Sequence, residues 1–176
     1  MAATAAGRTV DLRGRSETRT CRVATAKHRE IERKFLVLQL PEDLVRHPHA
    51  MLEQGYLALE TGGVQVRLRK TGTNLSLTYK RNRDAAREER EVTLTPEQFE
   101  VLWPATAERR LSKTRYDIPL GGLVVEVDVY GGRHEGLVVA EVEFSDEKEA
   151  ADFAPPPWLG DDVTHDPRYS NQLLAS

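Results

Sequence analysis

The stretch EIERKFLV, residues 30–37, begins with charged residues and ends in an apolar run typical of a β-strand. Glu30, Glu32 and Lys34 occupy every second position, and alternate residues of a strand project to the same face of its sheet. The spacing therefore predicts two carboxylates and one ammonium group in a single row about 13 Å long. Such a row becomes a candidate site if neighbouring strands extend it.

Other segments repeat the pattern, each with two charges of the same sign at alternate positions. The pairs are Glu30/Glu32, Arg67/Arg69, Glu89/Glu91, Lys113/Arg115, Glu126/Asp128 and Glu141/Glu143. For any single strand, a polar face in water explains the alternation. Two like charges about 4 Å apart repel by roughly 4 kcal/mol at an effective dielectric constant near 20. Neighbouring strands lie only about 4.8 Å apart, so several such pairs on adjacent strands indicate a bound group that neutralises them.

The two signs of charge predict two kinds of ligand. The cationic candidates are Lys34, Arg67, Arg69, Lys80, Lys113 and Arg115. Guanidinium groups match phosphate oxygens, so this set predicts a polyanion. The acidic candidates are Glu30, Glu32, Glu126, Asp128, Glu141 and Glu143. Ligand sets of oxygen alone favour Mg²⁺, Mn²⁺ or Ca²⁺ over zinc. A phosphate chain with a divalent cation fits both sets, because the metal shields the anion and can activate water.

Short strands must position these residues. We expect strands near 29–38, 50–60, 63–70, 74–82, 87–94, 109–118, 122–130 and 137–145, several of them separated by glycine-containing turns. Sequential strands of this kind predict an α+β fold built on an eight-stranded antiparallel β-barrel. If the charged face points inward, the barrel is a tunnel, and helices must cover its apolar outside. We expect this cover from helices at 95–104, 146–153 and 167–175.

Residues 1–28 are small, polar and rich in arginine, without sustained periodicity. We expect a disordered tail there and one domain over 29–176. The single cysteine, Cys21, excludes an internal disulfide and fits a reducing compartment.

The net charge of −3 argues against general nucleic-acid binding. No apolar run approaches the roughly 18 residues of a membrane span, and no signal peptide is visible, so we expect a cytoplasmic protein.

Taken together, the motifs resemble those of the CYTH domain family, also called triphosphate tunnel metalloenzymes. After EIERKFLV, the family's successive strands are matched in order by QGYL (54–57), VRLRK (66–70), SLTYKR (76–81), REEREV (87–92), SKTRYDIP (112–119), VVEVDVY (124–130), AEVEF (140–144) and DVTHDPRYSN (162–171). The resemblance covers about 30–171. One departure is Asp162, where short bacterial members usually have glutamate.

The resemblance implies a tunnel that binds a small triphosphate substrate with Mg²⁺ or Mn²⁺. It implies that the cationic candidates grip the phosphate chain and that Glu30, Glu32, Glu141 and Glu143 bind metal. Glu126 and Asp128 are supporting metal ligands, and Tyr56 is a candidate substrate contact. Catalysis is assigned to Glu32, Lys34, Glu141 and Glu143. We expect Glu141→Ala to abolish metal-dependent activity while leaving the fold intact or more stable, through relief of repulsion among the acids.

Several activities remain open at this point. The short chain and its ending favour hydrolysis of inorganic tripolyphosphate. A class IV-type adenylate cyclase would need an adenosine pocket, and a thiamine triphosphatase would need an aromatic platform. A module that only binds polyphosphate or nucleotides would not need the acidic pairs. Residual apolar outer surface is compatible with a homodimer.

Overall fold

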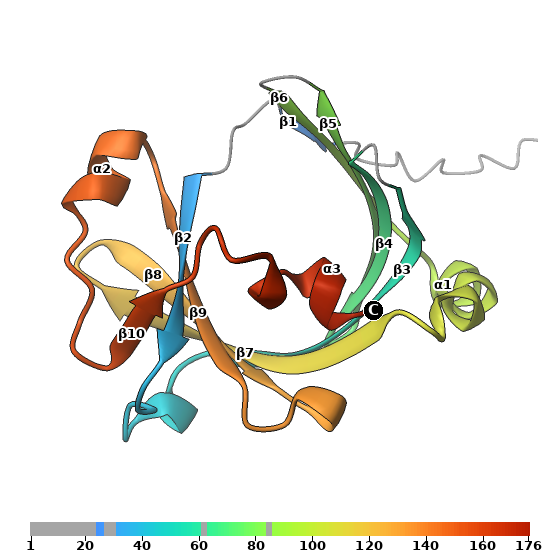
Figure 1. Cartoon of the computed structure of the whole chain (residues 1–176). Coiled ribbons are helices and arrows are strands. Elements are labelled where there is room, and N and C mark those ends of the chain that lie inside the picture. Colours follow the sequence, from blue (N-terminus) through green and yellow to red (C-terminus); the bar gives the residue numbers. More distant parts are fainter. Residues whose placement is uncertain (1–23, 27–30, 61–62, 84–85) are drawn as a thin grey trace, which may run out of the picture.

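The computed structural model describes residues 24–26, 31–60, 63–83 and 86–176, and most of them belong to one curved antiparallel sheet. The strands are β1 (Ala24–Ala26), β2 (Ile31–Val37), β3 (His49–Leu59), β4 (Val64–Thr71), β5 (Asn74–Arg83), β6 (Ala86–Thr93), β7 (Arg110–Leu120), β8 (Leu123–Tyr130), β9 (Val138–Phe144) and β10 (Leu159–Asp162). Their order across the sheet is β1-β6-β5-β4-β3-β7-β8-β9-β2-β10. Figure 1 shows this sheet curving around a central space.

The helices are short. They are η1 (Leu44–Arg46), α1 (Pro96–Leu102), η2 (Trp103–Thr106), η3 (Gly132–His134), α2 (Glu147–Asp152), η4 (Pro167–Tyr169) and α3 (Asn171–Leu174). A capping box at Thr95 and Gln98 begins α1, and Phe99 of that helix stacks on Trp103. None of the helices in the described ranges is long and apolar enough to cross a membrane.

The predicted barrel-like antiparallel fold is confirmed, and strands β2 to β9 correspond to the eight predicted segments. The sheet has two further strands. Ala24–Ala26 lies in the predicted tail but pairs with β6, and the rest of that tail is outside the described residues. Strand β10 pairs with β2. In the part of the chain that the structure describes, the sheet ends at β1 and β10, so hydrogen bonds between strands do not close it into a ring.

The predicted orientation of the two faces is also found. Phe35, Val125, Val127, Ala140 and Val142 are at most 1% exposed and form a core on the convex face of the sheet. Phe153, just after α2, packs against the Phe35 ring and so covers this core. The alternate residues of the same strands therefore point into the central space.

The C-terminal helix corrects one prediction. We expected residues 167–175 on the outside of the barrel, but α3 lies on the concave side, in the middle of the space in Figure 1. At this end, the inward-facing positions change from charged to apolar or aromatic and include Tyr130 and Val139. Leu174 and Ala175 pack there and are buried, and the Tyr130 hydroxyl donates to Asn171 Oδ1 at 2.7 Å. The helix lies on the concave side because the apolar surface that it packs against is on the inside of the barrel at this end.

Gly55 of β3 marks a tight contact between the sheet and η2. A Cβ added at this position would lie 2.4 Å from Thr106 Oγ1 and 2.5 Å from Thr106 Cβ. Thr106 cannot easily move, because its hydroxyl donates to Trp103 O and accepts from Arg110 Nε, both at 2.8 Å.

We therefore expect Gly55→Ala to lower the free energy of unfolding by about 1–3 kcal/mol, measured by urea denaturation. Gly131→Ala is the matched control, since its added Cβ would be 3.4 Å from Ser112 Oγ, an ordinary contact. Equal stability of the two variants would contradict this account.

Candidate active site

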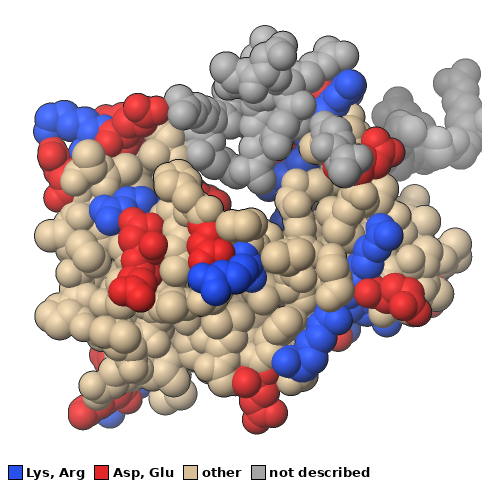
Figure 2. All heavy atoms as spheres, in the orientation of Figure 1, with Lys and Arg blue, Asp and Glu red and all other residues tan. Residues whose placement is uncertain are grey.

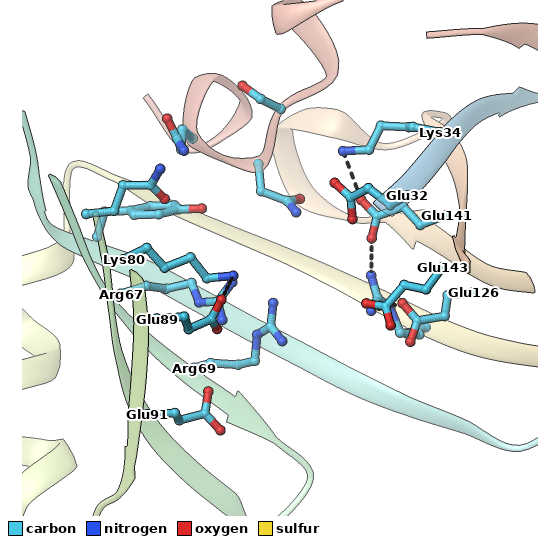
Figure 3. A pocket seen from close by; sticks show the side chains of 16 residues that line it. Glu32, Lys34, Arg67, Arg69, Lys80, Glu89, Glu91, Glu126, Glu141 and Glu143 are labelled. Carbon is cyan, nitrogen blue, oxygen red and sulfur yellow. Dashed lines mark hydrogen bonds and ion pairs between the residues drawn. The ribbon is translucent and has the colours of Figure 1, made fainter. Parts of the chain in front are cut away.

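A cavity of about 260 Å³ lies inside the curve of the sheet, with the C-terminal segment on one side. Nearly all of its lining side chains are polar or charged (Figure 3). They are Glu32, Lys34, Tyr56, Gln65, Arg67, Arg69, Lys80, Glu89, Glu91, Arg115, Glu126, Glu141, Glu143, Ser170, Asn171 and Gln172.

Strands β4 and β5 supply a basic wall, defined by Arg67, Arg69 and Lys80 (Figure 3). Lys80 Nζ is 2.6 Å from Glu89 Oε2 on the next strand. The two arginines have weaker partners, because Arg67 Nη2 donates to Thr78 Oγ1 at 3.2 Å and Arg69 Nη2 to Gln54 Oε1 at 3.3 Å. The Nε groups of both are buried and have no hydrogen-bond partner among the described residues.

Burial, together with the nearby charges of Arg67 and Arg115, lowers the pKa of Arg69 to about 10. A buried N–H group without a partner costs free energy, and so does a desolvated charge. The basic wall is therefore incompletely satisfied by the protein's own groups, and an anion would relieve it.

Strands β2, β8 and β9 supply an acidic wall, defined by Glu32, Glu126, Glu141 and Glu143. The strand register places Glu32 opposite Glu143, and it places Lys34 and Glu126 opposite Glu141 on either side. Two basic side chains form ion pairs with Glu141: Lys34 Nζ lies 2.9 Å from Oε1, and Arg115 Nη2 lies 2.7 Å from Oε2.

These carboxylates differ in their acidity. Burial acts to raise the pKa of Glu141, but Lys113, Lys34 and Arg115 outweigh it and hold this pKa well below its usual range. Burial raises the pKa of Glu126, which Arg115 only partly opposes although its guanidinium contacts that carboxylate directly. Glu141 is thus a weak base, and its main interactions are with the two cations beside it.

Below the acidic wall, Lys113 and Asp128 form a fully buried ion pair, with both side chains 0% exposed. Arg115 covers them, donating from Nε to Asp128 Oδ1 at 2.8 Å and from Nη2 to Asp128 Oδ2 at 2.7 Å. Burial lowers the pKa of Lys113, against the pull of Asp128. Neither residue lines the cavity, so a ligand could reach them only if this pair opened.

The structure brings ten of the predicted site residues to the cavity wall: Glu32, Lys34, Tyr56, Arg67, Arg69, Lys80, Arg115, Glu126, Glu141 and Glu143. Lys113 and Asp128 lie beneath it, and Glu30 falls outside the described residues. Tyr56 is 3% exposed, and its hydroxyl accepts from Gln54 Nε2 at 3.1 Å.

Six lining residues were not predicted as site residues: Glu89, Glu91, Gln65, Ser170, Asn171 and Gln172. Glu89 and Glu91 were noted in the sequence as a like-charged pair, without a role in the site. Gln65 shares the parity of Arg67 and Arg69, so alternation along β4 could have identified it. The other three come from the segment that enters the concave side, and no periodicity in the sequence signals that position.

The described residues contain no preformed group of three or more potential metal ligands. They nevertheless have suitable donors, since the acidic wall offers carboxylate oxygens alone. Mg²⁺ is commonly bound by one or two carboxylates together with waters and substrate phosphates, rather than by a complete protein cage. The residues fit such an ion if the substrate supplies part of its coordination, and Glu32 and Glu143 are placed to hold it.

The family model for the CYTH domain matches residues 28–170, and the chain belongs to the CYTH domain family. The resemblance inferred from the motifs is thus confirmed. An inorganic triphosphatase from Nitrosomonas europaea is 46% identical over 148 residues, covering 83% of this chain and 96% of that protein. An inorganic triphosphatase from Acetivibrio thermocellus is 35% identical over 150 residues, covering 84% and 93%. A crystal structure of an inorganic triphosphatase matches with a TM-score of 0.68 and 44% identity, covering 84% of this chain and 95% of that one.

The ion pairs of Glu141 argue against the expectation that its loss would leave the fold intact or more stable. A group whose pKa is depressed in the folded state stabilises that state above its unfolded pKa, here 4.5, and loses this effect as the pH falls below it. We expect Glu141→Gln to lower the free energy of unfolding at pH 7 by about 1–3 kcal/mol, because Lys34 and Arg115 lose a charged partner.

Urea denaturation at pH 7 and at pH 3 tests this, with Glu143→Gln on the same wall as the control. The deficit of Glu141→Gln should shrink at pH 3, and the control should change little. A Glu141→Gln protein as stable as the wild type at pH 7 would show that the ion pairs do not stabilise the fold.

For Arg69 we expect the opposite effect on the free energy of unfolding. Its folded pKa is lowered from 12.5 to about 10, so its charge destabilises the folded state at every pH below about 10. Arg69→Met should therefore raise the free energy of unfolding of the ligand-free protein at pH 7 by about 1–3 kcal/mol.

The same substitution should weaken the binding of a polyanion, which thermal denaturation with and without added inorganic triphosphate would measure. Lys70→Met is the control, since Lys70 is on the same strand but exposed, 3.5 Å from Glu53. The interpretation that the basic wall is incompletely satisfied and binds an anion is contradicted if Arg69→Met is less stable than the wild type and is still fully stabilised by triphosphate.

Proposed function

We propose that the protein hydrolyses inorganic triphosphate with Mg²⁺ or Mn²⁺ as cofactor. The observation that carries this proposal is the cavity, in which a basic wall faces an acidic wall across a space of about 260 Å³. The similarity to inorganic triphosphatases from two bacteria supports the same substrate, because both relatives are covered almost completely.

The size and lining of the cavity favour a compact, fully charged substrate. Pockets for larger organic ligands usually enclose about 300–1,000 Å³ and have largely apolar walls. Tyr56 is the sole aromatic side chain among the described lining residues, and Trp103 is stacked on Phe99 in the helices outside. These features argue against the thiamine triphosphatase and adenylate cyclase alternatives, which need room and contacts for an organic group.

The basic wall binds the phosphate chain in this proposal. Arg67 and Arg69 offer donors whose described partners are neutral, and phosphate oxygens match the geometry of a guanidinium group. Lys80, which is paired with Glu89, adds a third positive charge. Lys34 and Arg115 lie on the opposite side, held by Glu141, and neutralise charge that develops on the reacting phosphate. The phosphate chain is therefore bound by basic groups on both sides, which hold it in position.

The balance of charge supports the need for a divalent cation. The described lining includes six carboxylates and five basic groups, so the cavity without a metal has no excess positive charge for a polyanion. When bound, Mg²⁺ or Mn²⁺ would shield the phosphate oxygens and lower the pKa of a water molecule. Glu32, Glu141 and Glu143 are the residues that we propose to hold it, with Glu126 in support.

Proton transfer needs a base stronger than Glu141, whose pKa is held low. Glu143 is two residues away on the same strand, more exposed, and opposite Glu32. We assign to Glu143 the orientation of the attacking water and the acceptance of its proton. Positioning and charge neutralisation supply most of the rate enhancement in phosphoryl transfer, so a single carboxylate is sufficient as the base.

Charged side chains of both signs lie on the face shown in Figure 2. The absence of general nucleic-acid binding stays a prediction from the net charge. The cytoplasmic location and the homodimer stay predictions from the sequence.

Phosphate release from tripolyphosphate, pyrophosphate, ATP and thiamine triphosphate tests the proposal, each with Mg²⁺, Mn²⁺ or EDTA. We expect rapid turnover of tripolyphosphate with either metal, little of the others and none with EDTA. Arg67→Ala should reduce kcat/KM about 100-fold, because a group that stabilises the transition state is lost. Lys70→Ala should leave kcat/KM unchanged.

Two results would contradict the proposal. Formation of cyclic AMP from ATP as the main reaction would favour the cyclase. Tight binding of tripolyphosphate without turnover under any metal would favour the non-enzymatic module.

A further inference from the structure

The segment after β10 forms hydrogen bonds with both main-chain polar groups of Lys34, the amide N–H and the carbonyl oxygen. The Lys34 amide N–H donates to Thr164 Oγ1 at 2.9 Å, and the Val163 amide N–H donates to Lys34 O at 2.8 Å. Strand β10 itself ends at Asp162. The Thr164 side chain therefore supplies the acceptor that a further strand residue would otherwise give to this edge of β2.

The Thr164 hydroxyl has its direction fixed by Asp162. It has one proton, which it donates to Asp162 Oδ1, so its lone pairs are left for the Lys34 amide. The same carboxylate oxygen accepts from the Thr164 amide at 3.0 Å. Asp162 thus orients both polar groups of Thr164.

Asp162 is itself held by Arg33, the residue before Lys34. Arg33 Nε and Nη2 are 2.9 Å and 2.8 Å from Asp162 Oδ2. The other end of the guanidinium donates to Ala150 O and Phe153 O at 3.1 Å and 3.2 Å, and it lies over the Phe35 ring. Arg33 therefore fixes Asp162 to α2 and to the core on the convex face.

The same segment also reaches the end of the Lys34 side chain. It continues into η4, where Tyr169 O accepts from Lys34 Nζ at 3.4 Å, beside the ion pair with Glu141. Main chain and ammonium group of one cavity residue are thus both held by residues 162–169.

We propose that Asp162 and Thr164 are positioning residues for Lys34, acting through the hydroxyl of Thr164 and outside the cavity. The proposal rests on the proposed function where it concerns turnover, since Lys34 is a phosphate-binding group there. At position 162 the aspartate side chain reaches Arg33 and Thr164 and does not line the cavity. A small displacement of a group that holds the substrate costs a large part of the rate.

Thr164→Val and Thr164→Ser test the proposal, because valine keeps the shape and loses the acceptor, whereas serine keeps the hydroxyl. Amide hydrogen exchange of Lys34, followed by NMR, is the readout that needs no activity. Thr164→Val should speed this exchange about fivefold, the effect of one lost hydrogen bond, and Thr164→Ser should not. Thr114→Val on the convex face of β7 is the matched control.

Turnover of inorganic triphosphate with Mg²⁺ is the second readout. Thr164→Val should lower kcat/KM about tenfold, and Thr164→Ser should restore it to within about twofold. In a Lys34→Ala background, Thr164→Val should have no further effect, because the two residues act as a unit.

An equal additional loss in the Lys34→Ala background would show a merely structural role and overturn the proposal. Unchanged exchange of the Lys34 amide in Thr164→Val would overturn it as well. A wild-type protein that does not hydrolyse triphosphate would contradict the proposed function, while the exchange experiment would still decide the positioning role.

Discussion

Charge pairing inside the barrel is the constraint on which the rest of this structure depends. Asp128 lies between Lys113 and Arg115, and Glu141 lies between Arg115 and Lys34, so one chain of ion pairs crosses β7, β8, β9 and β2. Removing charges from water is expensive, and a buried ion pair often stabilises a protein less than apolar residues of the same size would. The charges of this chain of ion pairs are tolerated inside the barrel because each has an opposite charge in contact. Their presence in place of an apolar interior points to function rather than stability.

The two walls of the cavity use this constraint differently. On the acidic wall, Glu141 and Arg115 are engaged by charged partners, which fix their positions before any ligand arrives. On the basic wall, the guanidinium groups of Arg67 and Arg69 meet neutral Thr78 and Gln54, and each keeps an N–H without a partner among the described residues. One wall is therefore preorganised, and the other retains interaction energy for an anion. Because the two walls differ in this way, a phosphate chain can bind between them in a defined orientation.

The sequence predicted the strands and the faces of the sheet well, because alternation has a period of two and needs only local information. It placed Glu32, Lys34, Arg67 and Arg69 on one surface for that reason. It could not distinguish depth along a strand: Lys113 and Arg115 have the same parity, but the first is buried beneath the second.

Features that depend on distant parts of the chain were also beyond the reach of a local pattern. Strand β10 has four residues and includes a glycine, so only its pairing with β2 makes it a strand. Likewise, α3 has too little periodicity to show which side of the barrel it occupies. Its place is decided by inward-facing apolar residues such as Tyr130 and Val139, which come from other strands.

The brevity of α3 has a consequence for the order in which the molecule assembles. A helix of four residues has almost no stability in water by itself, because the cost of nucleation exceeds what so few hydrogen bonds return. The residues that α3 packs against come from β3, β7, β8 and β9. These strands must first be brought together over long sequence separations. The cavity is therefore completed late in folding, after the strands have curved, and until then its charged groups stay in contact with solvent and pay no cost of burial.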